Sequence, residues 1–190
     1  MVAHIVIPEG LVSEDNTPEE TYFLSDYFEA VLQQIIREVP ETDPVYISPA
    51  NAFGCAASEE EYAAQYLQKK RPELNVKYPI NIRDRPYLDT FDNARLLRKW
   101  LEQENLWPLG EVILYCNAPH ALRSKIMFEL CDFEVKQVIP SRPQKVKRKM
   151  IPRLWFYHYP VAQMVYELIA LGYNFMRGIL WKMKLENLKP

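Results

Sequence analysis

Two short polar motifs contain the residue types best suited to acid–base chemistry and to the binding of an anion. They are Asp89–Asn93 (Asp-Thr-Phe-Asp-Asn) and Asn117–Arg123 (Asn-Ala-Pro-His-Ala-Leu-Arg). His120 could act as a general acid or base, because an unperturbed imidazole titrates close to neutral pH. Arg123 follows three residues later, on the same side of a helix, and could hold a phosphate or a carboxylate in a bidentate grip. The second motif therefore predicts an anion site beside a proton-transfer group.

The first motif offers further side chains for the same ligand. Thr90 and Asn93 are three residues apart and can share one face of a helical turn. Asp92 is a second candidate for proton transfer, although Asp89 and Thr90 are also ordinary N-cap residues, which leaves a purely structural role open. Each motif opens a helix, whose free N–H groups and macrodipole suit an anion or a polar sugar. The catalytic candidates are His120 and Asp92, and the ligand-binding candidates are Asn51, Thr90, Asn93, Asn117 and Arg123.

Other kinds of site find less support in the sequence. The three cysteines, Cys55, Cys116 and Cys131, have no CxxC spacing, which argues against a disulfide scaffold and a zinc site. Asp89, Asp92 and His120 have no recognised ligand spacing, so no metal is expected. The chain has five glycines and neither a G-x-G-x-x-G motif nor a P-loop. This argues against standard binding of a dinucleotide or a nucleoside triphosphate.

Apolar runs and helical stripes alternate along the chain. Strands are expected at 3–8, 45–48, 76–80, 111–116 and 134–139, and helices at 20–39, 58–70, 90–104 and 119–131. The helix at 20–39 would have Phe23, Tyr27, Val31 and Ile35 on its apolar stripe. This pattern predicts one three-layer, Rossmann-like α/β domain of residues 1–190, whose core at 1–140 is a five-stranded, mostly parallel sheet.

The strand-to-helix turns of such a sheet lie at one edge, where ligands bind. We expect Glu9, Ser48, Asn51, Thr90, Asn93, Asn117, His120, Arg123 and Arg142 to surround that edge. A flavodoxin-like strand order, 2-1-3-4-5, is favoured, because neighbouring third and fourth strands would bring the two motifs together. In the order 3-2-1-4-5 two strands would separate the motifs, and Thr90 and Asn93 would be capping residues.

Charge is distributed unevenly around a net charge of −2. Residues 1–110 carry a net charge of −9 and residues 111–190 one of +7. The excess of cations is densest in a basic loop at 141–153, which could contact nucleic acid or an anionic membrane. A solvated loop is the simpler interpretation, and nucleic acid is not expected as a partner.

The last segment, 154–190, is expected to be aromatic at first and then helical from Pro160 to about Lys184. Its predicted apolar stripe consists of Val161, Met164, Val165, Leu168, Leu171, Phe175 and Ile179. The opposite side consists of Gln163, Glu167, Asn174 and Arg177, and the charges at Glu167 and Arg177 argue against a transmembrane span. We expect the stripe to dock onto the sheet or a second subunit, with an interfacial membrane helix as the alternative. The start of the chain lacks a basic stretch followed by a long apolar run, so a cytoplasmic location is expected.

Residues 88–94 and 112–124 resemble the core of the ElyC/SanA/YdcF family, a Rossmann-like domain of unknown function. The resemblance covers roughly residues 3–140, with its diagnostic positions between Asp89 and Ser124. It implies a polar site at the strand ends, S-adenosylmethionine as a candidate ligand, and a link to envelope metabolism. The chain departs from the family in its reduced turn at Glu9-Gly10, and in Cys116 or Asn117 where the family has threonine.

Two classes of function follow from these observations. The first is an enzyme or binding protein for a small anionic or nucleotide-like molecule, held by Arg123 and the helix N-termini, with His120 or Asp92 moving a proton. The second is a non-catalytic, envelope- or membrane-associated interaction module that uses the basic loop and the C-terminal helix.

Overall fold

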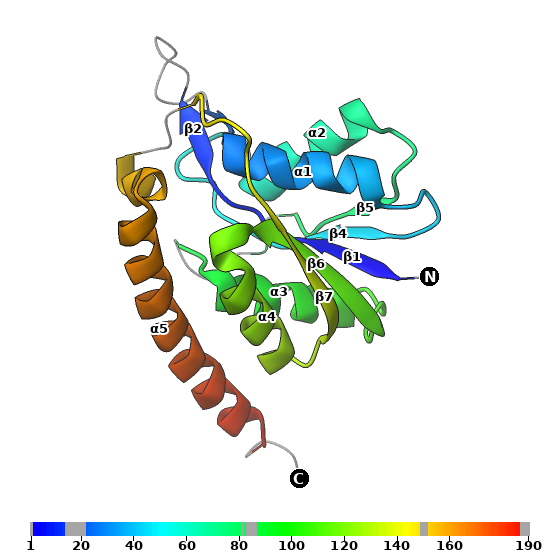
Figure 1. Ribbon diagram of the computed structural model, residues 1–190. Coiled ribbons are helices and arrows are strands. Elements are labelled where there is room, and N and C mark those ends of the chain that lie inside the picture. Colours follow the sequence, from blue (N-terminus) through cyan, green and yellow to red (C-terminus); the bar gives the residue numbers. More distant parts are fainter. Residues whose placement is uncertain (1, 14–21, 81, 83–86, 149–151, 187–190) are drawn as a thin grey trace.

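The structure of the chain, a computed structural model, describes residues 2–13, 22–80, 82, 87–148 and 152–186. Its centre is a five-stranded sheet in the order β5-β4-β1-β6-β7, in which every neighbouring pair of strands is parallel. The strands are β1 (Ala3–Val6), β4 (Val45–Ile47), β5 (Val76–Lys77), β6 (Glu111–Asn117) and β7 (Glu134–Ser141). Helices lie on both sides of this sheet (Figure 1), which confirms the predicted three-layer, Rossmann-like α/β fold.

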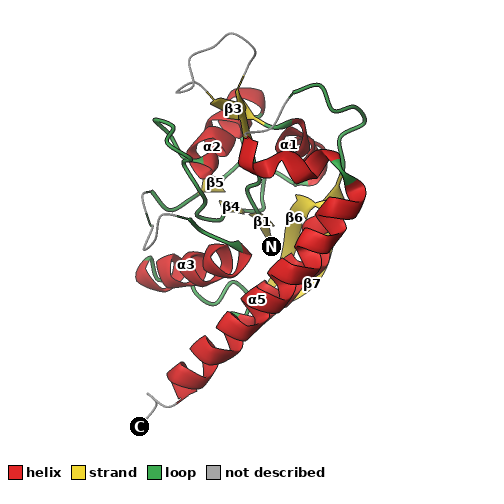
Figure 2. Cartoon of the chain, turned by 90° about the vertical axis from the view of Figure 1, so that its left-hand side faces the viewer, coloured by secondary structure: helices red, strands yellow, loops and turns green. Residues whose placement is uncertain are grey.

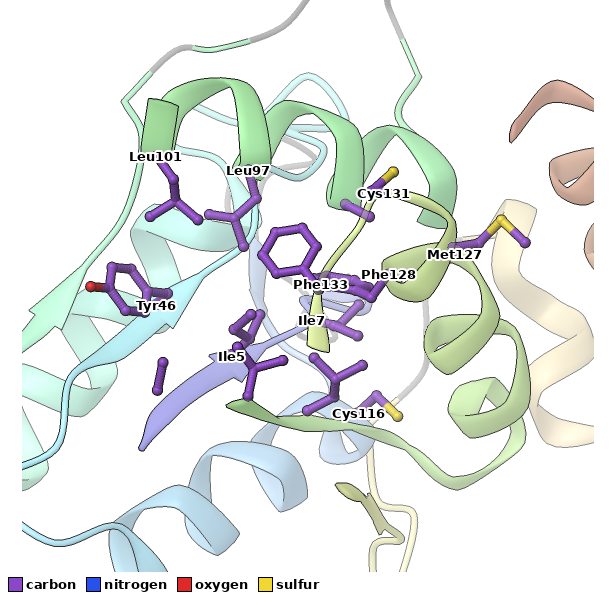
Figure 3. Close-up of a cluster of buried hydrophobic side chains, with 14 of the residues drawn as sticks. Ile5, Ile7, Tyr46, Leu97, Leu101, Cys116, Met127, Phe128, Cys131 and Phe133 are labelled. Carbon is purple, nitrogen blue, oxygen red and sulfur yellow. The ribbon is translucent and has the colours of Figure 1, made fainter. Parts of the chain in front are cut away.

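Each face of the sheet is covered by a pair of helices. They are α1 (Asp26–Glu38) and α2 (Glu59–Lys70) on one face, and α3 (Thr90–Gln103) and α4 (Ala121–Leu130) on the other. Phe28 of α1 is buried in the first layer, in one cluster with Val6 of β1. Leu97 of α3 and Phe128 of α4 are buried in the second, in one cluster with Ile5 (Figure 3). The alternation of Ile5 and Val6 thus joins β1 to both layers.

The first helix begins later than the sequence predicts. The chain forms a short antiparallel pair, β2 (Leu11–Ser13) with β3 (Tyr22–Leu24), before α1 begins at Asp26. Ser25 is the N-cap, and its hydroxyl oxygen accepts a hydrogen bond of 3.0 Å from the backbone N–H of Phe28. The prediction of a helix from residue 20 is therefore wrong at its start, and Phe23, placed on its apolar stripe, is exposed. Residues 14–21 lie outside the described part of the chain.

The order of the strands is not the flavodoxin-like order that we favoured from the sequence. Counted along the chain, the five parallel strands follow the order 3-2-1-4-5, with β4 and β1 between β5 and β6. The connection from β5 therefore crosses back over the sheet, and Phe91 at the start of α3 packs in one cluster with Ile5 and Ile7. We had expected α3 to begin next to β5, the strand that precedes it in the chain. The crossover brings α3 beside α4, and the two polar motifs meet in the disfavoured strand order.

A long helix, α5 (Pro160–Glu186), follows a short 3-10 segment, η2 (Pro152–His158), and runs along the outer side of the domain next to α3 and α4 (Figures 1 and 2). Its extent matches the prediction, but its orientation is reversed. The polar residues Gln163, Glu167 and Asn174 are at most 9% exposed and face the domain. Most of the predicted apolar stripe is instead exposed to solvent, although Leu171 packs against the core cluster. The prediction that this stripe docks onto the sheet is therefore wrong.

Candidate functional site

A small polar cavity of about 50 Å³ lies at the carboxyl ends of β1 and β4 and at the starts of α3 and α4. Its size corresponds to one or a few water molecules. The predicted rim residues that line it are Glu9, Asn51, Thr90, Asn93, His120 and Arg123. Tyr157 of η2 and Tyr166 of α5 complete the wall. The C-terminal segment thus covers the edge of the sheet at which the sequence predicts a ligand.

Arg123 occupies the centre of this site and is 4% exposed. Its Nε and Nη2 atoms donate hydrogen bonds to the two carboxylate oxygens of Glu167 on α5, at 2.8 and 3.1 Å. Its Nη1 atom donates to the hydroxyl oxygen of Thr90 at 2.6 Å. Burial disfavours the charged guanidinium, but the adjacent Glu167 carboxylate outweighs burial and raises the pKa of Arg123. The bidentate geometry that we expected for a ligand is therefore formed, with a carboxylate of the chain itself.

His120 lies beside Arg123 and is buried in a defined tautomer. Its Nδ1 atom contacts Nη2 of Arg123, which can only donate a hydrogen bond, so Nδ1 accepts and the ring proton belongs on Nε2. Burial, together with the positive charge of Arg123, lowers the pKa of His120 well below its usual range. The imidazole is therefore neutral at neutral pH, with its Nε2–H directed at the Glu9 carboxyl and the Tyr157 hydroxyl.

Glu9, which we expected at this edge of the sheet without a chemical role, is a titratable residue of the site. Its side chain follows β1, contacts Nε2 of His120 and is almost fully buried. Burial, with the negative charge of Glu167, raises the pKa of Glu9 well above its usual range, and the positive charge of Arg123 opposes this shift. Burial therefore favours the protonated, neutral form of the Glu9 carboxyl. An acidic residue directly after a buried strand was the signal for it, but nothing local indicated that the C-terminal segment would bury it.

Asn51 and Asn93 line the cavity, yet their amide groups bind the backbone of the surrounding loops. The Asn51 amide donates to the carbonyl of Leu88 at 2.9 Å and accepts from its N–H at 2.8 Å. The Asn93 amide donates to the carbonyl of Pro49. These two asparagines tie the loop after β4 to the start of α3, and so hold the walls of the cavity in place.

Asp92 and Asn117 do not line the cavity. Asp92 forms a capping box with Asp89 at the start of α3, and one of its carboxylate oxygens accepts from Nη2 of Arg177 on α5 at 2.9 Å. Asp92 also pairs with Arg95 at 3.2 Å. Asn117 is fully buried at the end of β6, and neither its amide nitrogen nor its amide oxygen has a hydrogen-bond partner within the described residues. The structure therefore separates Asp92 from His120 and brings Glu9 into its place.

Two further features bear on the chemistry of the site. Burial raises the pKa of the Cys116 thiol to about 12, so this cysteine is a core residue, as expected. Among the residues that the structure describes, no group of three or more His, Cys, Asp or Glu side chains is placed to hold a metal ion. The chemistry available at the rim is therefore anion binding by Arg123 and proton transfer by Glu9 and His120.

The predicted basic loop is folded back onto the domain over its first half. The backbone N–H of Arg148 donates to the Asp26 carboxylate at 2.7 Å, at the start of α1, and its guanidinium binds Glu29 at 2.9 Å. Arg142 lines a second cavity, of about 490 Å³, beside η2 and the start of α5. Lys149 and the two residues after it lie outside the described part of the chain, as does the side chain of Arg153.

No model of a protein family, no curated protein and no solved structure matches this chain. In the part of the chain that is described, no helix has both the length and the apolar character needed to cross a membrane.

Proposed function

We propose that the rim cavity binds a small anionic molecule, or the anionic end group of a nucleotide-like one, and that the chain is an enzyme in which Glu9 and His120 exchange a proton with it. The observation that carries this proposal is the bidentate contact between Arg123 and the Glu167 carboxylate. A buried guanidinium in this geometry matches any planar carboxylate or phosphate group. Glu167 is thus an internal substitute for the anion.

Binding requires the carboxylate of Glu167 to leave Arg123. A cavity of about 50 Å³ has no room for a second anion while that carboxylate is in place. Glu167 belongs to α5, whereas Arg123 and its other partner, Thr90, belong to α4 and α3. A shift of the Glu167 side chain, or of α5, would therefore expose the guanidinium and leave Thr90 bound to it. The N-terminus of α3 adds a favourable dipole on the same side.

A proton can then pass between the anion-bound molecule and the pair Glu9–His120. Burial favours the protonated form of Glu9, which can donate a proton, and His120 can accept one at Nδ1 when Arg123 no longer donates to that atom. Two titratable groups whose pKa values are shifted in opposite directions from their usual positions form a common acid–base arrangement. Asp92, the other catalytic candidate from the sequence, takes no part because it is bound to Arg177.

S-adenosylmethionine, the candidate ligand that the family resemblance implies, does not fit this cavity as a whole molecule. The volume of about 50 Å³ admits an end group and leaves no space for a nucleoside beneath α5. No step of the proposed chemistry therefore depends on this cofactor.

The test compares two buried arginine–carboxylate pairs that hold α5. Glu167→Gln removes the negative charge of the side chain that occupies Arg123. Asp92→Asn removes the negative charge of a side chain that binds Arg177. Inorganic phosphate, small carboxylates, nucleotides and S-adenosylmethionine are screened by thermal shift, and each hit is measured by calorimetry. We expect Glu167→Gln to tighten the binding of at least one anion about tenfold, which corresponds to about 1.4 kcal/mol. Asp92→Asn should leave that affinity unchanged, and Arg123→Lys should weaken it.

Two results would contradict the proposal. The first is a wild-type chain and a Glu167→Gln variant that bind none of these anions. The second is an anion whose affinity responds to Asp92→Asn and not to Glu167→Gln, because the ligand would then lie at Arg177.

A further inference from the structure

The outward half of α5 is an uninterrupted apolar surface. Ten large apolar side chains lie on it, with exposed fractions from 43% to 70%. They are Val161, Met164, Val165, Leu168, Ile169, Tyr173, Phe175, Met176, Leu180 and Met183. At about 100° per residue these positions cover about half of the helix circumference. We call this surface the outer face of α5.

The outer face is larger than the scattered apolar exposure of an ordinary domain. Side chains of these types and exposures present on the order of 1,000 Å² of apolar surface, whereas the largest patch of a typical monomer measures about 300–600 Å². The helix is fixed with its other side toward the domain, because Glu167 is bound to Arg123 and Arg177 to Asp92. The outer face therefore points away from the domain. The part of the chain that the structure describes thus supplies no occupant for the outer face.

The ends of the outer face are cationic. Arg142, Lys145 and Lys147 are exposed in the loop before η2, and Lys184 is exposed at the far end of α5. The loop lies close to the helix, since Arg142 and Met164 line one cavity of about 490 Å³. Glu167, an acidic residue of α5, is turned toward the domain and is therefore not part of the outer face.

Charge and shape together favour a lipid surface over a second copy of the chain. Two α5 helices paired in antiparallel fashion would bring the cationic loop of one against Lys184 of the other. A parallel pair would bring like ends together, so both arrangements oppose cation to cation. A partner helix also buries a narrow seam, whereas a bilayer interface covers a wide arc. Trp155 and Tyr159, each 57% exposed next to the start of α5, are residue types enriched at membrane interfaces.

We infer that the outer face of α5 lies on the surface of an anionic lipid bilayer, with the helix axis in the plane of the interface. The apolar side chains enter the headgroup boundary, and the exposed cations at both ends of the face contact anionic headgroups. Figure 2 shows α5 along one outer side of the domain, where a flat surface can reach it over its length. The inference is independent of the anion site, because the residues that carry it are on the opposite side of the helix.

The test is co-sedimentation of the full chain with lipid vesicles. One set contains phosphatidylcholine alone, and the other contains phosphatidylcholine and phosphatidylglycerol in equal parts. Ile169→Glu is compared with Ile80→Glu, because these isoleucines are 68% and 63% exposed and Ile80 belongs to the loop after β5, not to α5. We expect the wild-type chain to bind the anionic vesicles, Ile169→Glu to lose at least tenfold in partitioning, and Ile80→Glu to bind like wild type. Both positions are exposed, so both variants should fold, which circular dichroism and thermal unfolding will check.

A second pair of variants tests the charges. Lys145→Gln with Lys147→Gln should weaken binding to anionic vesicles by roughly fivefold per lysine. The same change at the exposed Lys69 and Lys70 of α2 should have no effect. Absence of wild-type binding to anionic vesicles would overturn the inference, as would an equal loss in Ile169→Glu and Ile80→Glu. A dimer in sedimentation equilibrium that Ile169→Glu dissociates, without vesicle binding by the wild type, would overturn it in favour of a second copy of the chain.

Discussion

Two clusters of arginine and carboxylate side chains hold α5 against the domain, and they differ in what surrounds them. Arg123 binds Glu167 beside His120 and Glu9, and it lines a cavity. Arg177 binds the capping box at the start of α3 and does not line that cavity. A buried ion pair alone is weak evidence of function. The first cluster differs in that its arginine lines the cavity and contacts a buried histidine, and on this difference, not on the ion pair itself, we propose it as the site.

The largest expected effect separates the two clusters by stability. Arg123→Ala leaves Glu167 buried without its guanidinium and should cost about 3–5 kcal/mol of unfolding free energy. Arg177→Ala should cost about 1–2 kcal/mol, because that side chain is 21% exposed and Asp92 keeps Arg95 as a partner. Urea unfolding followed by circular dichroism measures both values. Equal losses of unfolding free energy in the two variants would contradict the expected difference in stability between the two clusters.

The second effect is a dependence of stability on pH that belongs to Glu9. Burial raises the pKa of Glu9 in the folded chain above its unfolded value. The folded state therefore keeps a proton that the unfolded state has released, and stability falls as pH rises from the unfolded pKa toward the folded one. Glu9→Gln, which cannot ionise, should gain on wild type by about 1.4 kcal/mol per pH unit in that window.

Unfolding free energies of wild type and Glu9→Gln between pH 4 and pH 8, measured in parallel with Glu104→Gln on the surface, test this dependence. His120 acts in the opposite sense. Its lowered folded pKa makes stability fall as pH drops below the unfolded value, and this part should be retained in Glu9→Gln. Parallel curves for wild type and Glu9→Gln would mean that Glu9 is not buried as an acid.

A third effect, smaller than that of Arg123→Ala, concerns the hydrogen bond between Arg123 and Thr90. Thr90→Val removes the acceptor of Nη1 and keeps the shape of the side chain, so we expect a loss of about 1.5–3 kcal/mol in stability. Thr90→Ser keeps the acceptor and should recover most of that loss. If Thr90→Val has the unfolding free energy of the wild type, the hydrogen bond from Arg123 to α3 does not contribute to stability. Arg123 and Glu167 would then act as an isolated ion pair.

The sequence predicted the layers of this fold because each depends on local pattern. A short apolar run such as Val112–Tyr115 is typical of a strand in a sheet with two covered faces, and Ser58 with Glu61 forms a local capping box at the start of α2. The prediction of the strand order was wrong because the residues after β5 do not indicate which strand the next helix packs against. The start of α1 was wrong because the apolar positions around Phe23 fit a helical stripe as well as a strand.

The site was predicted in part, and the missing part came from contacts distant in sequence. His120, Arg123 and Thr90 meet at one edge of the sheet, although we expected them to do so only in the flavodoxin-like strand order. Glu167 is 44 residues from Arg123, and its pairing depends on which face of α5 turns inward. Periodicity separates the two faces of a helix but does not say which of them points inward. In α5 the polar face points inward, where Glu167 binds the buried Arg123. Glu9 gained its raised pKa from the same burial.

The most direct test of the account observes both arginines in one spectrum. The guanidinium Nε–H resonances of Arg123 and Arg177 are assigned by NMR and followed during titration with the anion that binds most tightly in the thermal-shift screen. The account predicts a saturable shift of the Arg123 resonance as the ligand replaces the Glu167 carboxylate, and no shift at Arg177. A titration in which Arg123 stays unchanged while the ligand binds would contradict it.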